Sequence, residues 1–328
     1  MDYSMTKRIF VTRQISPKAV TMLKKRCNVI MWESEDQPVP RNELLKRIVG
    51  CDGLYCLLTD NIDVEVIDAA GPNLKIISTM SAGFDHIDIV TCKQRNITVG
   101  FTPDVLTATA ELTVALLLMV SRRTVEGVNI VKSGGWGSWK PIWMCGSSLS
   151  DSTVGIVGLG RIGLAVARRL KPFGVKRFLY NNQNPKSEAD IICAEFVSFD
   201  KLLRESDFVV ICCPLTPDTK EMFSRHAFEK MKSSAILINT SRGGIIQHDD
   251  LYQALKTGQI KAAGLDVTTP EPLPSDHQLL SLTNCVVLPH IGSATEDSRD
   301  LMAVLAAENL LAGLEDLPMP HEVNIGVE

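Results

Sequence analysis

The stretch Thr153–Leu170 reads T-V-G-I-V-G-L-G-R-I-G-L-A-V-A-R-R-L, and its pattern decides the fold class of the chain. Val154–Val157 is a short apolar run, rich in β-branched residues, of the kind found in buried parallel strands. The run breaks at Gly158, Gly160 and Gly163, after which apolar residues take up helical spacing. A strand, a glycine turn and a helix in this order predict a dinucleotide-binding unit.

Each part of this turn has its own expected task. The first glycine permits the tight turn, the second lets the backbone approach a pyrophosphate, and the third lets the helix pack against the strand. The N–H groups at the start of the helix, at Arg161 and Ile162, would then face the anion. The turn therefore predicts a cofactor site made largely of backbone.

Length and composition describe an ordinary globular chain. Its 328 residues are about twice the usual size of one domain, so we expect two. A hydrophobic fraction of 45% and a charged fraction of 22% are typical of soluble proteins. A net charge of −4 argues against a nucleic-acid partner, which would need a basic face. No apolar run approaches the ~20 residues needed to cross a membrane, so we expect no membrane association.

Targeting and redox features favour the cytoplasm. Residues 1–8 lack the apolar core of a secretory signal, and the last residues, I-G-V-E, match no peroxisomal or retention signal. The nine cysteines are an odd number and show no C-x-x-C or zinc-ligand spacing. We therefore expect reduced thiols, no metal site and a reducing, cytoplasmic location.

The first hundred residues alternate short apolar strands with helical patterns. This alternation predicts βαβ units and a parallel sheet with helices on both faces. The segment has no glycine fingerprint, so we expect a smaller, flavodoxin-like doubly wound domain, with a cleft between it and a Rossmann domain. The expected strands are Arg8–Thr12, Val29–Trp32, Gly53–Leu58, Lys75–Thr79 and Ile97–Gly100, and the expected helices are Pro17–Arg26, Asn42–Val49, Val64–Ala70 and Asp88–Arg95.

A long apolar helix pattern, Asp104–Ser121, is expected to link the two domains. After Thr153 the alternation resumes and predicts six strands, and the last helix, Thr295–Leu311, would return to the first domain. We therefore expect a discontinuous smaller domain, residues 1–103 and 298–328, and a dinucleotide-binding domain, residues 104–297. The further expected strands are Phe178–Asn181, Phe208–Cys213, Ala235–Asn239, Ala262–Val267 and Val286–Pro289, with helices at Lys201–Glu205, Arg225–Met231 and Asp249–Lys256.

Polar residues gather where the predicted strands end, which is the edge at which open α/β sheets bind ligands. They are Ser81–Gly83, Asn239–Gly244, Asp266 with Glu271, and His290. Histidine titrates near neutral pH and can donate a proton to a carbonyl oxygen, and a neighbouring carboxylate favours its protonated form. An arginine, which the second segment contains, can grip a carboxylate with two parallel hydrogen bonds. Together these groups fit hydride transfer to a 2-keto acid.

Several motifs make the chain similar to D-isomer-specific 2-hydroxyacid dehydrogenases over essentially its whole length. They are Gly158–Gly163 (G-L-G-R-I-G), Asn239–Gly244 (N-T-S-R-G-G), Gly264–Val267 followed by Pro270–Pro272 (P-E-P), and Leu288–Gly292 (L-P-H-I-G). The resemblance implies an NAD(P)H-dependent reductase of small 2-keto acids. The tracts Ser78–His86 and Gly134–Trp143 resemble the members that reduce glyoxylate and hydroxypyruvate to glycolate and D-glycerate.

The resemblance also implies a role for individual residues. His290 would be the general acid and base, Glu271 its partner, and Arg242 the holder of the substrate carboxylate, with the first domain binding substrate. Further substrate contacts would come from the N–H groups of Ala82 and Gly83 and from Asp266, and further cofactor contacts from Pro214, Thr240, Asp266 and Gly292.

The resemblance further implies a homodimer. Members of the family pair through their cofactor domains, using the segment between the linker helix and the glycine turn, here about residues 122–150. Ser133–Gly146 holds three of the four tryptophans, and exposed aromatic residues anchor interfaces. An irregular loop folded onto its own domain would fit these residues equally well. In the dimer, Trp139 would reach the neighbour's cleft and limit the size of the substrate.

The segment after Tyr180 bears on the choice of cofactor. An NAD-selective site places Asp or Glu about 20 residues after the glycines, whereas Asn181–Lys186 reads N-N-Q-N-P-K and holds no acid. Lys186 can pair with a 2′-phosphate, and the amides of Gln183 and Asn184 can bond either cofactor. The sequence therefore predicts a preference for NADPH, with NADH weaker.

Two other functions stay open at this point. A 3-phosphoglycerate dehydrogenase would need further basic residues and uses NAD, so the missing acid argues against it. A dinucleotide-sensing corepressor of the C-terminal-binding-protein type shares the fold and keeps a similar site. It would bind a peptide and show negligible turnover, and the tryptophan tract favours the reductase over it.

Overall fold

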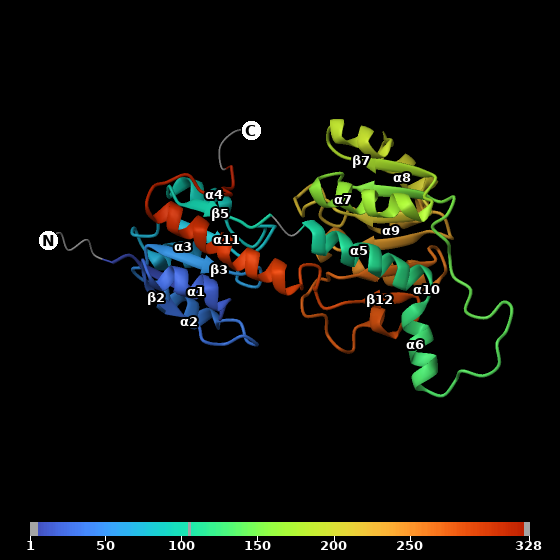
Figure 1. The fold of residues 1–328 in the computed structure, drawn as a ribbon, viewed down its shortest axis with the longest axis horizontal. Coiled ribbons are helices and arrows are strands. Elements are labelled where there is room, and N and C mark those ends of the chain that lie inside the picture. Colours follow the sequence, from blue (N-terminus) through green and yellow to red (C-terminus); the bar gives the residue numbers. More distant parts are fainter. Residues whose placement is uncertain (1–5, 104–105, 325–328) are drawn as a thin grey trace. The chain divides into compact units, whose positions relative to one another are not determined.

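The computed structural model describes residues 6–103 and 106–324 and divides the chain into two compact units. Unit 1 comprises residues 1–105 and 294–328, and unit 2 comprises residues 106–293 (Figure 1). Each unit is a parallel sheet covered by helices, which confirms the predicted α/β class. Asp104 and Val105, at the start of the expected linker helix, lie outside the described residues.

Unit 1 is built on five parallel strands in the order β2-β1-β3-β4-β5, the flavodoxin-like order. β3 (Gly53–Cys56) and β4 (Ile76–Thr79) are buried along their whole length, as strands covered on both faces must be. The remaining strands are β1 (Arg8–Val11), β2 (Asn28–Met31) and β5 (Thr98–Gly100), and the helices are α1 (Pro17–Lys24), α2 (Arg41–Arg47), α3 (Val64–Ala70) and α4 (Ile89–Gln94).

The last helix of the chain packs on the sheet of unit 1. α11 (Glu296–Leu314) contacts α1, β3 and β4, and buries small residues such as Ala303 and Ala306 in the same core cluster as Ile76. Gly313 allows this close approach, because a Cβ atom there would lie 2.8 Å from the Ile76 side chain. Unit 1 is thus made of two separate chain segments.

Unit 2 holds seven parallel strands in the order β12-β11-β10-β9-β6-β7-β8. The order reverses between β6 (Thr153–Val157) and β9 (Phe208–Ile211), so the ligand-binding crevice is expected at the carboxyl ends of these two strands. The other strands are β7 (Arg177–Asn181), β8 (Ala194–Phe196), β10 (Ile236–Asn239), β11 (Ala262–Leu265) and β12 (Cys285–Val287), and the helices are α5 (Leu106–Ser121), α6 (Thr124–Lys132), α7 (Arg161–Leu170), α8 (Phe199–Glu205), α9 (Arg225–Lys230) and α10 (His248–Lys256).

α5, the described part of the expected linker helix, belongs to unit 2 and packs against α7, β10 and β11 (Figure 1). Its buried Leu116 and Leu117 lie in one core cluster with Ile156 and Ile238 of the sheet. A second cluster fills the opposite face of the sheet, beneath α8, α9 and α10. The sheet of unit 2 is therefore covered on both sides.

Two elements of unit 2 were not predicted. The sequence predicted six strands, but β8 adds a seventh, a three-residue edge strand whose Glu195 pairs with Arg177 of β7 at 2.6 Å. The second element, α6, buries none of its residues, although Val125, Val128 and Val131 recur at helical spacing. Of the two, β8 depends on contacts that a periodicity search does not detect.

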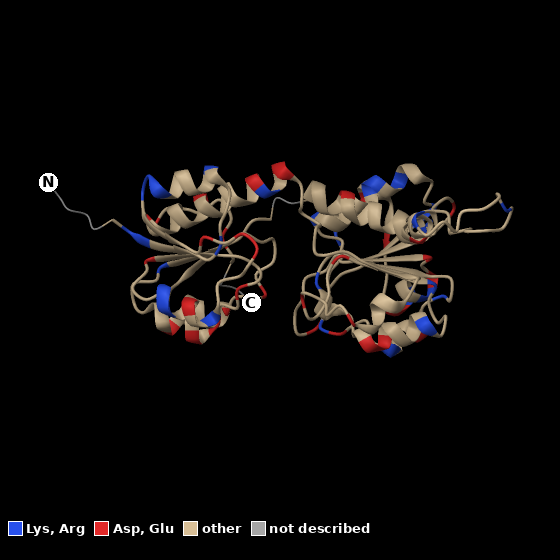
Figure 2. Cartoon of the chain, turned by 90° about the horizontal axis from the view of Figure 1, so that it is seen from below, with Lys and Arg blue, Asp and Glu red and all other residues tan. Residues whose placement is uncertain are grey.

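Two further features of the described residues are their hydropathy and the distribution of their charges. In the part of the chain that the structure describes, no helix is long and apolar enough to span a membrane. Lys and Arg alternate with Asp and Glu along the outer helices of each unit (Figure 2).

Candidate active site

The glycine turn after β6 leaves room for a ligand at one position. Gly158 has a φ of +96°, and a Cβ atom there would lie 2.5 Å from the backbone N of Cys213. A Cβ atom at Gly163 would lie 2.4 Å from the carbonyl oxygen of Gly158. At Gly160, by contrast, a Cβ atom would meet no atom of the described structure within 4 Å. Two glycines therefore serve the fold, and the third leaves open space beside the backbone.

The start of α7 fits an anion. The helix has ten residues, Gly160 is its N-cap without a side-chain hydrogen bond, and its first turn holds no acidic residue. Its first backbone N–H groups point along the helix axis away from the turns that follow, as in any helix start. The open space at Gly160 and the positive end of the helix dipole together fit the pyrophosphate of a dinucleotide.

A rigid turn after β10 presents Thr240 and Arg242. The buried Asn239 side chain donates from Nδ2 to the Arg242 carbonyl oxygen at 2.9 Å and accepts from the Ser241 N–H at 3.0 Å. Ser241 donates in turn to the Cys213 carbonyl oxygen at 2.5 Å, which ties this turn to the end of β9. The next residue, Gly243, must be glycine because a Cβ atom there would lie 2.1 Å from the Thr268 backbone. The backbone that carries the Arg242 side chain is thus held in place by hydrogen bonds and by close packing against Thr268.

Asp266, directly after β11, holds the segment that carries His290. Its carboxylate is 1% exposed and accepts the N–H groups of Ile291 at 2.8 Å and Gly292 at 2.7 Å. Burial raises the pKa of Asp266, and these two hydrogen bonds lower it by less. The His290 N–H donates to the Asp266 carbonyl oxygen at 2.9 Å. His290 has a φ of +55°, an uncommon conformation that these bonds maintain.

Glu271 and His290 form a hydrogen-bonded pair. Nδ1 of His290 lies 2.8 Å from one carboxylate oxygen of Glu271, and the other oxygen accepts the Thr268 N–H at 2.9 Å. Burial alone would raise the pKa of Glu271, but the His290 and Thr268 hydrogen bonds, with the charges of His290 and Arg242, lower it. Nε2 of His290 makes no hydrogen bond within the described ranges. A histidine with one nitrogen held by a carboxylate and the other available is arranged for proton transfer.

Other predicted cofactor residues lie along the same edge of the sheet. The Thr240 hydroxyl lies 2.7 Å from that of Thr113 on α5, a buried contact that sequence reasoning did not identify. The Pro214 carbonyl oxygen accepts from the Thr219 hydroxyl at 2.7 Å. The remaining predicted residues, Gln183, Asn184 and Lys186, are exposed in the loop after β7.

Ala82 and Gly83 lie in unit 1, at the carboxyl end of β4. The preceding Ser81 is buried, and its hydroxyl accepts the Gly83 N–H at 3.3 Å. Both residues are half-buried, and their contact with a substrate remains a prediction.

Trp139 lies on an extended arm, which we define as α6 and the loop Ser133–Gly146. Its side chain is 81% exposed, and Trp136 and Ile142 on the same loop are exposed as well. The arm projects from the body of unit 2 (Figure 1). Of the two alternatives for this loop, the structure supports exposure rather than packing onto its own domain.

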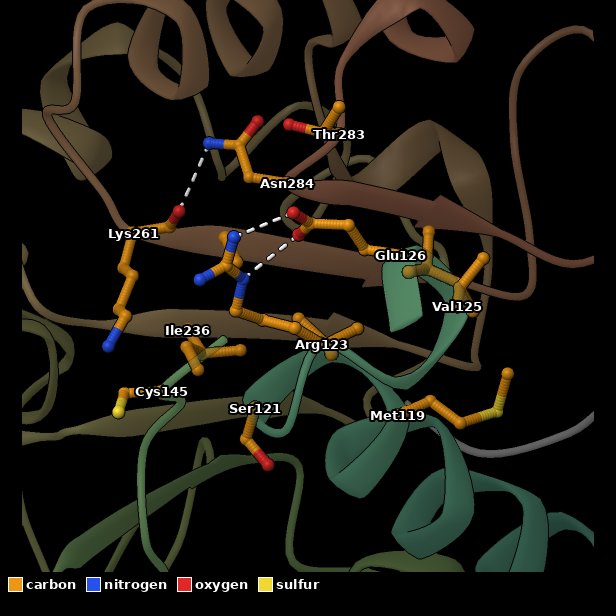
Figure 3. Close-up of a pocket in the computed structure, with 13 residues that line it drawn as sticks. Met119, Ser121, Arg123, Val125, Glu126, Cys145, Ile236, Lys261, Thr283 and Asn284 are labelled. Carbon is orange, nitrogen blue, oxygen red and sulfur yellow. Dashed lines mark hydrogen bonds and ion pairs between the residues drawn. The ribbon is translucent and has the colours of Figure 1, made fainter. Parts of the chain in front are cut away.

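Figure 3 shows a pocket of about 230 Å³ in unit 2. It lies at the amino ends of the strands, whereas the catalytic pair follows their carboxyl ends. It is lined where β10, β11 and β12 begin, by residues such as Ile236, Ala262 and Val286. Arg123 and Glu126 face each other across two hydrogen bonds of 2.7 and 2.9 Å at its rim. None of the predicted catalytic residues lines this pocket, so it is not the candidate active site.

Within residues 6–103 and 106–324, no three His, Cys, Asp or Glu side chains gather as ligands for an ion.

Comparison with known proteins agrees with the fold. Residues 114–292 match the model of the D-isomer specific 2-hydroxyacid dehydrogenase NAD binding domain. The chain is 55% identical over 322 residues to the glyoxylate reductase/hydroxypyruvate reductase of Homo sapiens, covering 97% of this chain and 98% of the relative. It is 48% identical to the glyoxylate reductase of Thermofilum pendens, covering 97% and 94%.

Solved structures agree as well. A protein of Thermus thermophilus superposes with a TM-score of 0.89 at 44% identity, covering 96% of this chain and 99% of that one. An NADPH-dependent glyoxylate/hydroxypyruvate reductase of Sinorhizobium meliloti, solved with NADP and malonate, superposes with a TM-score of 0.84 at 29% identity, covering 98% and 97%. Both likenesses extend over nearly the whole chain, as the sequence matches do. The chain therefore belongs to the D-isomer specific 2-hydroxyacid dehydrogenase family.

Proposed function

We propose that this protein reduces glyoxylate and hydroxypyruvate to glycolate and D-glycerate, and that it uses NADPH in preference to NADH. The observation that carries the proposal is the Glu271–His290 pair at 2.8 Å, on the same sheet edge as Arg242 and the open glycine turn. Relatives of 55% and 48% identity bear the names of reductases for these acids, which supports the substrate class.

His290 is assigned the proton transfer. With Nδ1 held by Glu271, Nε2 is the atom that faces outward and gives its proton to the carbonyl oxygen of the keto acid. Arg242 binds the carboxylate of the substrate with its planar fork. The backbone N–H groups of Ala82 and Gly83, in unit 1, are assigned as further donors to the substrate. The glycine turn and the start of α7 would hold the pyrophosphate of NADPH, which would supply the hydride for carbon 2 of the substrate. Together the hydride and the proton would convert the carbonyl group at carbon 2 into the hydroxyl group of the 2-hydroxy acid.

The preference for NADPH rests on the segment after β7. Residues 181–186 hold no carboxylate that would repel a 2′-phosphate. The Lys186 backbone N–H is fixed by the Tyr180 hydroxyl at 3.0 Å, while its side chain is exposed and forms no ion pair within the described structure. A lysine so placed can neutralise the additional phosphate of NADPH.

A homodimer is proposed through the arm. α6 exposes Val128 and Val131, its loop exposes Trp136 and Trp139, and Lys140 is the single charged residue of that loop. Exposed apolar surface of this kind, depleted in charge, marks an interface. The pocket at the base of the arm, which Cys145 also lines, would be covered by the second copy. Trp139 of one protomer would then close the substrate cleft of the other.

The dimer proposal is tested with Trp139→Ala. Sedimentation velocity is expected to show weaker dimerisation, and larger 2-keto acids are expected to become better substrates. An unchanged dimer with unchanged substrate preference would contradict the role given to Trp139.

The nine cysteines support a reducing compartment. All nine are free thiols in the structure, with no disulfide to maintain. A cytoplasmic location is therefore part of the proposal, and fractionation of expressing cells tests it.

The activity is tested by initial rates for each acid paired with each cofactor. The proposal expects turnover of glyoxylate and hydroxypyruvate, with a higher kcat/KM for NADPH than for NADH. Tight dinucleotide binding without turnover of either acid would contradict the enzyme and favour a dinucleotide sensor. Equal kcat/KM for the two cofactors would contradict the preference alone.

A further inference from the structure

Asn182, which follows β7, is tied to the glycine turn by its side chain. Its Oδ1 accepts the N–H of Leu159, the residue between the first two glycines, at 2.6 Å. Because a backbone N–H can only donate, this contact fixes which end of the amide faces the turn. Nδ2 therefore points away from Leu159, and it donates no hydrogen bond to any described residue.

The neighbouring side chains do not share this position. The amide of Asn181 turns to the other side and donates to the Val197 carbonyl oxygen at 3.0 Å. Gln183, Asn184 and Lys186 are exposed, and no hydrogen bond joins their side chains to the glycine turn. Of the residues that follow β7, Asn182 is thus the one held against the dinucleotide-binding backbone.

The position of Asn182 corresponds to the acid of NAD-selective sites. Such an acid lies about 20 residues after the glycines and accepts a hydrogen bond from the ribose 2′-hydroxyl. Asparagine has nearly the shape of aspartate, but an uncharged NH2 group, a donor, stands where a negative oxygen would be. A donor at this place suits the acceptor oxygens of a 2′-phosphate, whereas a carboxylate repels them.

We propose that Asn182 is a determinant of cofactor choice in this chain, in addition to Lys186. Its Oδ1 holds the glycine turn in shape, and its Nδ2 donates to the phosphorylated ribose of NADPH. The inference rests on the dinucleotide-binding function proposed above. It goes further by assigning the selection to a residue that the loop sequence did not single out.

The decisive variant is Asn182→Asp. It keeps the oxygen that accepts from Leu159 and replaces the outward NH2 by a negatively charged oxygen. Isothermal titration of the full-length protein with NADPH and with NADH, without substrate, measures the Kd for each. We expect NADPH to bind at least about tenfold more weakly and NADH to bind equally well or better. The loss of one charge-assisted hydrogen bond to the 2′-phosphate is enough to raise the Kd about tenfold.

Two further variants make the result specific. Asn181→Asp places the same charge one residue earlier, on a side chain directed at Val197, and is expected to change the NADPH/NADH Kd ratio less than about threefold. Asn182→Ala removes the acceptor of the Leu159 N–H and the outward donor without adding charge. It is expected to weaken both cofactors, with NADPH affected more. Thermal melting of each variant confirms that it is folded.

A Kd ratio in Asn182→Asp within about threefold of the wild-type ratio would overturn the inference, and so would an equal shift in Asn181→Asp. Its failure is distinguishable from failure of the proposed cofactor preference. A wild-type protein that binds NADH more tightly contradicts that preference. The change caused by Asn182→Asp is measured relative to wild type, so it tests the role of Asn182 in either case.

Discussion

Replacing Glu271 by Gln tests the catalytic pair with a change of a single side-chain group. In the wild-type protein the two carboxylate oxygens have separate partners, the Thr268 N–H at 2.9 Å and Nδ1 of His290 at 2.8 Å. Glutamine has one oxygen. If that oxygen stays with Thr268, the NH2 group faces Nδ1, and the ring must carry its proton on the other nitrogen.

The size of the effect follows from this mismatch. An amide in place of the carboxylate that orients a catalytic histidine imposes the wrong tautomer, and the related change in serine proteases lowers kcat by about 10⁴-fold. General acid catalysis as a whole is worth about 10²–10⁴-fold. Since the Glu271 side chain is 31% exposed and water can partly replace it, we expect kcat to fall by about 10²–10³-fold.

The assay is steady-state oxidation of NADPH with hydroxypyruvate, with the Kd of NADPH measured separately. Glu229→Gln is the matched control, because it makes the same change in an exposed ion pair on α9, where Glu229 bonds Arg225 at 3.0 Å. The control should keep wild-type kcat, since such pairs contribute only about 0.3–0.5 kcal/mol. Should Glu271→Gln retain more than a third of wild-type kcat, the role given to Glu271 is wrong.

Three more changes test other parts of the site. Gly160→Ala should leave the melting temperature unchanged, because its Cβ meets no atom within 4 Å, yet weaken NADPH binding at least about tenfold by titration. Asp266→Asn leaves one buried N–H of the His290 segment without an acceptor, so urea unfolding should show a loss of about 1–3 kcal/mol, and kcat should fall as well. Intact NADPH binding by Gly160→Ala would refute the first prediction, and a wild-type unfolding curve for Asp266→Asn would refute the second. His248 is 8% exposed, and burial and the nearby His277 lower its pKa. The unfolded chain therefore binds a proton that the folded chain resists, and stability should fall as pH drops below about 6.5 by up to about 1.4 kcal/mol per unit. His248→Phe should make urea unfolding less pH-dependent in that range, and an unchanged slope would count against this reading.

The backbone part of the site could be predicted from the sequence. The turn at Gly158, Gly160 and Gly163 is local, so the residue types alone indicate a backbone conformation and an open approach. The alternation of strands and helices along the chain predicted the two parallel α/β sheets. By contrast, β8 has three residues and is held by the Arg177–Glu195 pair, which only the register of neighbouring strands brings together.

The side-chain contacts of the site were harder to predict from the sequence. Strand ends directed attention to Glu271 and His290, but their pairing at 2.8 Å depends on the Asp266 bonds that hold the His290 segment. Asp266 was expected to contact ligands. In the structure both its carboxylate oxygens accept backbone N–H groups, so Asp266 also holds the segment that carries His290. Asn182 was not among the predicted cofactor residues, because nothing in the loop sequence reveals its contact with Leu159.

The central claim is that His290 transfers the proton when a small 2-keto acid is reduced. The most direct measurement compares the rate of NADPH oxidation by hydroxypyruvate in the wild-type protein and in His290→Gln, with chiral analysis of the glycerate formed. The account predicts rapid turnover to D-glycerate in the wild type and a rate about 10²–10⁴-fold lower in the variant, with NADPH binding retained. Equal rates in the two proteins would contradict the assignment of His290, and no wild-type turnover of hydroxypyruvate or glyoxylate would contradict the reductase itself.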